Sequence, residues 1–393
     1  VLIVAVVVAW LVQRDFGQVE VTNVRYENFN GIPIRAKLLR PVEATAENPL
    51  PGSVYIHGYQ NNRETSDAYC LEMARRGFVM LCIDAIGRGN SGEPNDPEDA
   101  DFDETYGGLS SLAYLRSLPF VDPDSVGMMG HSLGAEMAYG VALQEPAVKA
   151  LVITGFAYTL DATESNPPNM LMVIGKYDEY RERMTGTNDV AAELMRSPQT
   201  LAAFGNAEAN FSTTYGDFDA GTARRVVLLP NIHIQESHSR QGIAEAVTWM
   251  RAALEPDVAY WINANRQIWE IKEWSTLAAM VTGFASVLPL CLILLQTKFF
   301  SSLQGAVPEG YTCPRREFFK HATVNGALMW LYLPLILILF AVHVYVIPID
   351  KVFPMMMVNG TVWWFVLTNI IGFLILKRWR KKRADEVSWA DLG

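Results

Sequence analysis

Apolar residues in the first two thirds of the chain occur in short runs separated by longer amphipathic stretches. Residues 19–39 alternate apolar and polar positions around the turn signal Asn30-Gly31, which predicts an antiparallel hairpin. The apolar runs that follow have the length of buried strands, and they cover residues 53–56, 78–83, 125–129, 150–153, 170–174 and 225–229. This alternation of strand and helix predicts an α/β fold, a mostly parallel sheet with helices on both faces.

Two of the intervening helices have recognisable ends. A helix over residues 64–76 would be closed by Gly77, and Ser239 is placed to cap a helix that runs to about residue 254. Two long stretches, residues 93–103 and 204–222, lack such periodicity. Loops of that length are commonly functional covers or mobile surface, and we expect these two to control access to a pocket.

The last third of the chain has a different pattern. Residues 275–296, 322–347 and 355–376 are each long and apolar enough to cross a hydrocarbon core of about 30 Å. Residues 1–12 form a fourth apolar run of only about 18 Å as a helix. We expect this run to belong to a longer, truncated helix; the alternative is a signal-peptide remnant, but no small-residue cleavage pattern follows it.

The predicted organisation is therefore an α/β domain held by about four transmembrane helices. Residues 1–13 would form the first helix, 14–271 the α/β domain, 272–380 three further helices and 381–393 a basic tail. Ionisable residues are scarce in the late spans, where His343 alone lies well inside, so a transport path is not indicated. Anchoring in the lipid bilayer is the simplest role, and a membrane-protein partner, a homo-oligomer or a lipid substrate remains open.

Charge divides the chain in the same place. From residue 272 onward there are 12 Lys plus Arg and 7 Asp plus Glu, a net of +5, which leaves −15 for residues 1–271. An acidic domain repels phosphate backbones, so nucleic acid is excluded as a partner. The basic cluster at 377–383 predicts a cytoplasmic C-terminus for this multi-pass membrane protein. The basic loop at 298–320 would also be inside and the loop with Lys351 outside, so residues 14–271 would be extracytoplasmic.

The four cysteines lack the close pairing of a metal site, and no metal is expected. Cys70 and Cys82 could form a disulfide outside the cell, but Cys82 falls at a buried position of a predicted strand and Cys70 on a predicted helix. We favour two buried thiols. Cys291 and Cys313 fall in the membrane part.

One motif carries chemistry. Gly130-His131-Ser132-Leu133-Gly134 follows a predicted strand and opens a predicted helix. Glycines on both sides of a serine permit the tight turn that raises its hydroxyl above the sheet edge, as in a nucleophile elbow. A serine hydroxyl becomes a good nucleophile only when a base takes its proton and a carboxylate orients that base. An ordinary glycine-rich turn is the alternative, but the strand before and the helix after favour the elbow.

At this point residues 50–254 resemble the α/β-hydrolase superfamily of serine hydrolases. His57-Gly58-Tyr59 is similar to the family's oxyanion-hole turn, and residues 84–92 are similar to its D-x-x-G-x-G-x-S segment. The resemblance implies that the backbone N–H groups of Tyr59 and Leu133 form the oxyanion hole, and that His57 shapes the turn. The hairpin in front of the core is most similar to the dienelactone hydrolase and prolyl-oligopeptidase-like branches.

The family's chain order of serine, acid and histidine implies where the other two catalytic residues lie. Gly175-Lys176-Tyr177-Asp178 follows an apolar strand and resembles the G-x-x-D segment that carries the acid, so Asp178 is favoured, with Glu179 as its rival. Two histidines follow the last predicted strand. We favour His233 as the base, three residues past Pro230, and keep His238, just before the predicted cap Ser239, as second choice.

The predicted function is a membrane-anchored serine hydrolase of the esterase, thioesterase or amidase type. It would act outside the cytoplasm through an acyl-enzyme on Ser132, with Asp178 and His233 completing the triad and without a cofactor. The substrate would be an acyl-containing small molecule or a lipid-like molecule. An acyltransferase with the same triad and a non-catalytic hydrolase-fold subunit of a membrane complex are the alternatives.

Overall fold

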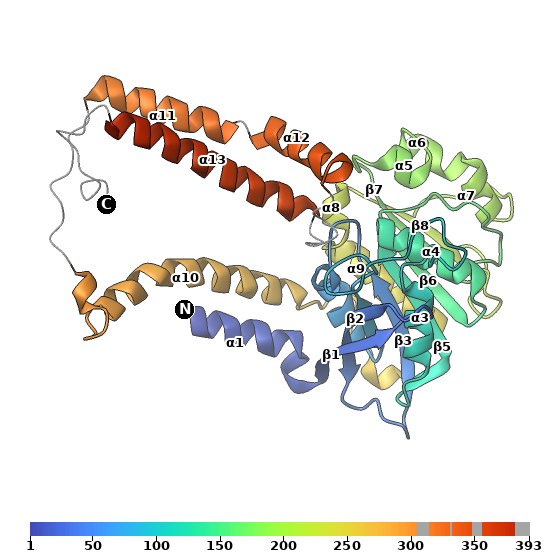
Figure 1. Cartoon of the computed structure of the whole chain (residues 1–393). Coiled ribbons are helices and arrows are strands. Elements are labelled where there is room, and N and C mark those ends of the chain that lie inside the picture. Colours follow the sequence, from blue (N-terminus) through green and yellow to red (C-terminus); the bar gives the residue numbers. More distant parts are fainter. Residues whose placement is uncertain (305–313, 331, 348–355, 382–393) are drawn as a thin grey trace. The chain divides into compact units, whose positions relative to one another are not determined.

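The chain folds into two compact units, Val1–Val287 and Leu288–Gly393, each of which is described by itself. The computed structural model describes residues 1–304, 314–330, 332–347 and 356–381. The first unit contains an eight-stranded sheet in the order β1-β2-β4-β3-β5-β6-β7-β8 (Figure 1). Its strands are β1 (Val19–Glu27), β2 (Pro33–Pro41), β3 (Leu50–Ile56), β4 (Val79–Ile83), β5 (Val121–His131), β6 (Val148–Thr154), β7 (Met170–Gly175) and β8 (Arg224–Leu229).

The predicted hairpin and the predicted parallel sheet are both confirmed. Strands β1 and β2 pair antiparallel from Val19 opposite Pro41 to Glu27 opposite Pro33, with the Asn30-Gly31 turn between them. Strand β2 runs antiparallel to β4, and every later pairing in the sheet is parallel. The carboxyl ends of β3 and β5 to β8 therefore share one edge of the sheet, where an α/β protein binds its ligands.

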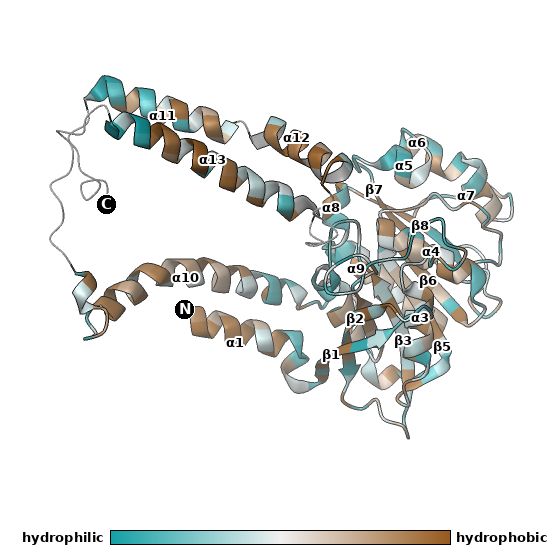
Figure 2. Cartoon of the chain, in the orientation of Figure 1, coloured by the Kyte–Doolittle hydropathy of each residue, from teal (hydrophilic) through white to brown (hydrophobic). Residues whose placement is uncertain are grey.

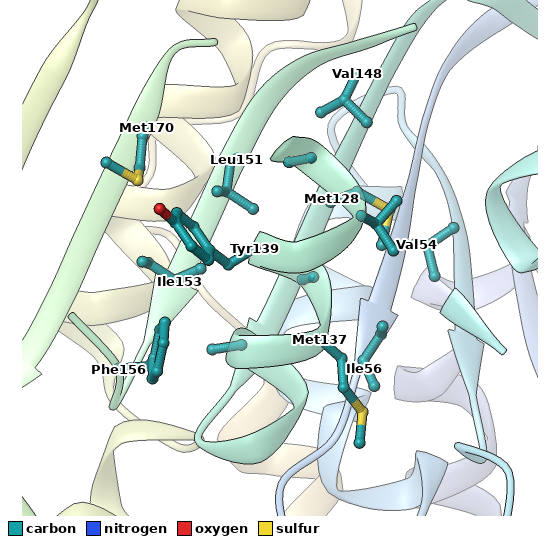
Figure 3. Close-up of a cluster of buried hydrophobic side chains, with 14 of the residues drawn as sticks. Val54, Ile56, Met128, Met137, Tyr139, Val148, Leu151, Ile153, Phe156 and Met170 are labelled. Atoms are coloured by element: carbon teal, nitrogen blue, oxygen red, sulfur yellow. The ribbon is translucent and has the colours of Figure 1, made fainter. Parts of the chain in front are cut away.

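Helices cover both faces of the sheet. Side chains alternate along each parallel strand, so Val54 and Ile56 pack on one face and Tyr55 on the other. The first face is covered by α3 (Gly108–Arg116) and α4 (Leu133–Gln144), and the second by α2 (Asp67–Ala74) and α9 (Arg240–Leu254). Figure 3 shows α4 packed on β3, β5, β6 and β7 through buried side chains.

The expected helix ends are largely where the sequence places them. Ser239 caps α9 by accepting a hydrogen bond from the N–H of Gly242, and the helix ends at Leu254. The expected helix over 64–76 begins as a 3-10 turn, η2 (Arg63–Ser66), and continues as α2. The remaining short elements of this part are η1 (Asp15–Gly17), α5 (Arg181–Thr185), α6 (Val190–Glu193), η3 (Leu194–Arg196), α7 (Pro198–Ala203), α8 (His233–Glu236) and η4 (Val258–Tyr260).

The interpretation of Cys70 and Cys82 as free buried thiols is wrong. Cys70 on α2 and Cys82 on β4 are joined by a disulfide. Both side chains are buried, as expected, but α2 packs directly on β4, which brings the two sulfur atoms together. Cys291 is free, and Cys313 lies outside the described residues.

Two described helices are long and apolar enough to cross a membrane, Trp269–Leu295 (α10) and Val358–Lys381 within α13 (Met356–Lys381). Figure 2 shows the apolar character of both. The N-terminal helix α1 (Leu2–Gln13) is apolar but shorter. The expected span 322–347 is described as two helices, α11 (Arg315–Trp330) and α12 (Tyr332–Tyr345), on either side of residue 331, and η5 (Ser301–Leu303) precedes them. The predicted count of four transmembrane helices is thus not confirmed.

Candidate active site

Ser132 occupies a sharp turn between β5 and α4. Its backbone has φ 55° and ψ −123°, a conformation that non-glycine residues rarely adopt and that is typical of functional sites. The flanking glycines are required for close packing. A Cβ on Gly130 would lie 2.3 Å from the carbonyl oxygen of Gly134, and one on Gly134 would lie 2.2 Å from that of Ile56. The motif therefore forms the strand–turn–helix arrangement expected of a nucleophile elbow.

The structure brings Ser132, Asp178 and His233 together. Nε2 of His233 lies 2.7 Å from Oγ of Ser132, and Nδ1 of His233 lies 2.7 Å from Oδ2 of Asp178. A carboxylate only accepts hydrogen bonds, so Nδ1 carries the proton and Nε2 is left as the acceptor for the serine hydroxyl. All three side chains are buried, and each comes from the carboxyl end of a different parallel strand.

Neighbouring backbone groups hold the acid and the histidine in place. The other carboxylate oxygen of Asp178 accepts the N–H of Tyr180 at 2.7 Å. Glu179, the rival acid, does not contact the ring of His233. Instead, its carboxylate accepts the backbone N–H of His233 at 3.0 Å. Desolvation, the largest single influence, raises the pKa of Glu179. The hydrogen bonds from the backbone N–H groups of His233 and of Glu179 itself, together with the charge of His233, outweigh it and lower this pKa below its usual value.

The second candidate base, His238, is not brought to Ser132. Its Nδ1 is 2.9 Å from the hydroxyl of Ser237, and its ring lies 5.8 Å from that of Trp269. Desolvation lowers the pKa of His238. Of the two histidines after β8, His233 is therefore the one in hydrogen-bond contact with the serine.

The expected oxyanion-hole residues border Ser132 from two sides. Leu133 is the first residue of α4, where backbone N–H groups have no partner within the helix. Tyr59 follows β3 and lines the same pocket as Ser132. His57 donates from Nδ1 to the carbonyl of Gly58 at 2.8 Å and accepts the N–H of Ala85 at its Nε2 at 3.2 Å. His57 thus holds the turn after β3 against the segment that follows β4.

Comparison with known proteins agrees with this fold. The family model of the X-Pro dipeptidyl-peptidases, S15 family, matches residues 30–218. The uncharacterized protein YcjY of Escherichia coli K12 is 33% identical over 89 residues, which cover 22% of this chain and 29% of that protein. The acyltransferase drtE of Aspergillus calidoustus is 26% identical over 147 residues, which cover 37% of this chain and 46% of that protein. The chain thus spans less than half the length of either relative.

The chain has an α/β-hydrolase-like fold with a mostly parallel sheet. Among solved structures, a bacterial heroin esterase is similar at a TM-score of 0.42 and 15% identity, over 64% of this chain and 90% of that protein. The residues that match the S15 family model include the turn at Ser132 but end before β8 and His233.

The pocket that contains Ser132 has a volume of about 660 Å³. Its lining comes from the turn after β3, from the elbow, from α5 with its preceding residue Tyr180, and from α8. The residues are Gly58, Tyr59, Gln60, Asn61, Thr65, His131, Ser132, Tyr180, Arg183, Met184, His233, Ile234, Ser237 and His238.

The expectation that residues 93–103 and 204–222 control access is wrong for the described chain, because neither stretch lines this pocket. Short helices that directly follow β7 and β8 are closer to the serine, and they carry no distinctive sequence signal.

A buried acidic residue, Glu236, was also missed from the sequence. It lies on α8 three residues after His233, and no motif marks it. Together with His131 and His233 it forms a group whose ligand atoms lie within 4.8 Å of one another, close enough to hold a metal ion. Both ring nitrogens of His233 are, however, within hydrogen-bond distance of Asp178 and Ser132, and Nε2 of His131 lies 3.2 Å from the carbonyl oxygen of His233. Burial, followed by the neighbouring His233, lowers the pKa of His131 to about 3, so this ring is neutral.

Proposed function

We propose that this chain is a membrane-anchored serine hydrolase that cleaves an ester, thioester or amide through an acyl-enzyme on Ser132. The observation that carries the proposal is the pair of 2.7 Å distances that link Ser132, through His233, to Asp178. This is the geometry in which an imidazole can remove the serine proton while a carboxylate holds its tautomer. The match of residues 30–218 to the S15 peptidase family model also supports a hydrolytic enzyme.

In the first half of the reaction, Oγ of Ser132 attacks the carbonyl carbon of the substrate as its proton passes to Nε2 of His233. Asp178 keeps its negative charge and stabilises the imidazolium through Nδ1–H. The N–H groups of Tyr59 and Leu133 donate to the oxyanion. His233 then protonates the leaving group, which departs and leaves the acyl group on Ser132.

In the second half, water takes the place of the leaving group. Nε2 of His233 accepts one water proton while the water oxygen attacks the acyl carbon, and the same proton returns to Oγ of Ser132 as the acid product leaves. Every step uses groups that already surround the serine, so no cofactor is required by this scheme.

The charge of the pocket favours particular substrates. None of the described residues that line it is an aspartate or a glutamate, and Arg183 is its one Lys or Arg side chain. A substrate ammonium in a partly buried pocket needs a carboxylate partner. We therefore propose a neutral or anionic acyl substrate, in contrast to peptides with a free N-terminal amine. Arg183 is largely exposed and lies 3.9 Å from Glu136, so it is available to a carboxylate or phosphate group.

The membrane part of the proposal rests on the apolar helices and the charge pattern. Helices α10 and α13 have the length and composition of spans, and the basic residues 377–383 favour a cytoplasmic C-terminus. The hydrolase domain would then act outside the cytoplasm on lipid-like or envelope substrates. Protease added to intact cells tests this orientation. Loss of the C-terminal tail under those conditions would reverse it.

A fluorophosphonate probe on the full chain in detergent tests the catalytic proposal. We expect covalent labelling of Ser132 in the folded protein and none in Ser132→Ala. A folded protein that is not labelled would favour the alternative of a non-catalytic hydrolase-fold subunit. The substrate class is tested by comparing kcat/KM for p-nitrophenyl esters with kcat/KM for dipeptide p-nitroanilides, the latter with a free or an acetylated N-terminal amine. A preference for the dipeptide with the free amine would contradict the proposed neutral or anionic acyl substrate.

Acyl transfer is the second candidate, and the likeness to a fungal acyltransferase favours keeping it. In that reaction an alcohol replaces water as the acceptor, with the same proton movements at His233. Product analysis with a p-nitrophenyl ester and added alcohol separates the two reactions. Hydrolysis predicts the free acid as the main product, and transfer predicts the new ester.

A further inference from the structure

A second carboxyl group converges on the same imidazole nitrogen that Asp178 holds. The side chain of Glu236 is completely buried, and its Oε2 lies 3.4 Å from Nδ1 of His233 and 3.5 Å from Nε2 of His131. Its Oε1 accepts the N–H of Gly175, whereas Oε2 has no hydrogen-bond partner. A buried polar atom without a partner is rare in proteins, and here it faces the proposed catalytic base.

The surrounding backbone is shaped to admit this carboxyl group. A Cβ on Gly155 would lie 2.2 Å from Oε2 of Glu236 and 3.1 Å from Cε1 of His233. A Cβ on Gly175 would lie 2.9 Å from Oε1. Only glycine at these two positions leaves room for the carboxyl group beside the ring. The hydroxyl of Tyr69 donates to the carbonyl of Glu236 at 3.0 Å and so fixes the backbone of α8 as well.

The titratable groups around Glu236 favour its neutral form. Asp178 and Glu179 face it from the segment after β7, His131 from the end of β5 and His233 from its own helix, and the phenols of Tyr55 and Tyr69 approach from β3 and α2. Burial raises the pKa of Glu236 most, and the charges of Asp178 and Glu179 raise it further, against the lowering effect of the Gly175 N–H. Two carboxylates beside one neutral imidazole would repel each other, so one of the two stays protonated.

We propose that Glu236 is a reserve acid for His233, a positioning residue that is neutral while Asp178 is ionised and that takes over Nδ1–H when the charge of Asp178 is lost. The inference rests on the proposed triad. In the absence of the Asp178 carboxylate, Glu236 releases its proton to solvent and its Oε2 accepts the hydrogen bond from Nδ1–H. The site then again holds one carboxylate and one imidazole with Nε2 free to accept the serine proton.

A double-mutant cycle on the full chain tests this role. The variants are Asp178→Ala, Glu236→Gln and the two combined, with Asp178→Ala/Glu179→Gln as a control that also removes a neighbouring carboxylate. The measurement is kcat/KM for a p-nitrophenyl ester from pH 5 to 9. We expect Glu236→Gln to cost at least about ten times more in the Asp178→Ala background than in the natural one, which corresponds to about 1.4 kcal/mol of coupling.

The pH profile separates this role from a purely structural one. Activity of Asp178→Ala should rise with pH as Glu236 ionises, and this rise should be absent in Asp178→Ala/Glu236→Gln but present in the Glu179 control. Equal costs of Glu236→Gln in both backgrounds, or the same pH profile in both double variants, would overturn the proposal.

Infrared spectroscopy tests the protonation of Glu236 directly and does not require catalytic activity. The C=O stretch of a protonated, buried carboxyl group should be present at neutral pH in the unsubstituted protein and absent in Glu236→Gln. The band should weaken in Asp178→Ala at the same pH. Its absence from the unsubstituted protein would overturn the proposal even if every variant failed to fold. Failure of fluorophosphonate labelling at Ser132, with the infrared band present, would instead reject the proposed function.

Discussion

Nε2 of His233 lies 2.7 Å from Oγ of Ser132, although 101 positions separate the two residues in the sequence. The contact forms because β5 and β8 lie in one parallel sheet, so the turns after them open at the same edge. His238, only five residues further along, faces Trp269 and Ser237 instead. The single helical turn α8, which separates the two histidines, thus decides which of them contacts Ser132.

Separate substitution of the two histidines is expected to give very different losses. His233→Ala should reduce kcat/KM by about 10⁴-fold or more and abolish fluorophosphonate labelling, because Ser132 loses its base. His238→Ala should cost at most about tenfold, since that ring only lines the pocket. Labelling rates of the two purified variants provide the measurement. Labelling retained in His233→Ala and lost in His238→Ala would reverse the assignment.

The elbow should not tolerate a methyl group at Gly134. A Cβ there meets the carbonyl oxygens of Ile56 and His57 at 2.2 and 2.3 Å, so Gly134→Ala should destabilise the fold by at least about 2 kcal/mol. Gly140 on the same helix has no atom within 4 Å of such a Cβ. Gly140→Ala should stabilise the protein by about 0.5–1 kcal/mol, and thermal unfolding of the pair is the test. Equal effects of the two substitutions would contradict the packing described for α4.

The buried pair Arg76 and Glu72 should contribute strongly to stability. Both side chains are fully buried, and Arg76 also donates to the carbonyls of Ile262 and Asn263 at 2.9 and 2.8 Å. Arg76→Leu leaves Glu72 paired with Arg75 alone, at 2.8 Å, and removes the donors to these two carbonyls, so we expect a loss of about 1–3 kcal/mol in urea unfolding. Arg25→Leu on the exposed side of β1 is the control, with an expected change within about 0.5 kcal/mol.

The raised pKa of Glu236 predicts how stability depends on pH. A carboxyl group that holds its proton more tightly in the folded state makes the folded protein bind more protons than the unfolded chain above pH 4.5. Ionisation of Glu236 therefore lowers the free energy of unfolding as the pH rises from 4.5 towards the pKa of Glu236 in the folded protein. Below pH 4.5 Glu236 is protonated in both states and does not change this free energy. Glu236→Gln should remove this loss and flatten the curve between pH 5 and 8.

Urea unfolding across that pH range measures the effect. The exposed Glu47→Gln serves as the control for the loss of one carboxyl group. A Glu236→Gln curve parallel to that of the unsubstituted protein would mean that Glu236 titrates normally in the folded state.

Much of the α/β domain could be predicted because its signals are local. The Asn30-Gly31 turn between alternating strands, the apolar runs of the parallel sheet and the cap at Ser239 each depend on a few neighbouring residues. The turn at Ser132 is also a local signal, because the serine and the two glycines that permit its strained backbone lie within five consecutive residues. Asp178 and His233 followed from the family's chain order and from the ends of β7 and β8.

Only the tertiary structure decided which atoms meet across the sheet. It joined Cys70 to Cys82, lined the pocket with α5 and α8 in place of the two long loops, and placed Glu236 beside the ring of His233. None of these contacts leaves a periodic or compositional trace, because each depends on the packing of segments that are separate in the sequence. The sequence alone determined which segments form strands and the glycine-flanked turn at Ser132. The buried environment that sets protonation around His233 arises only when segments distant in the sequence pack together and exclude water.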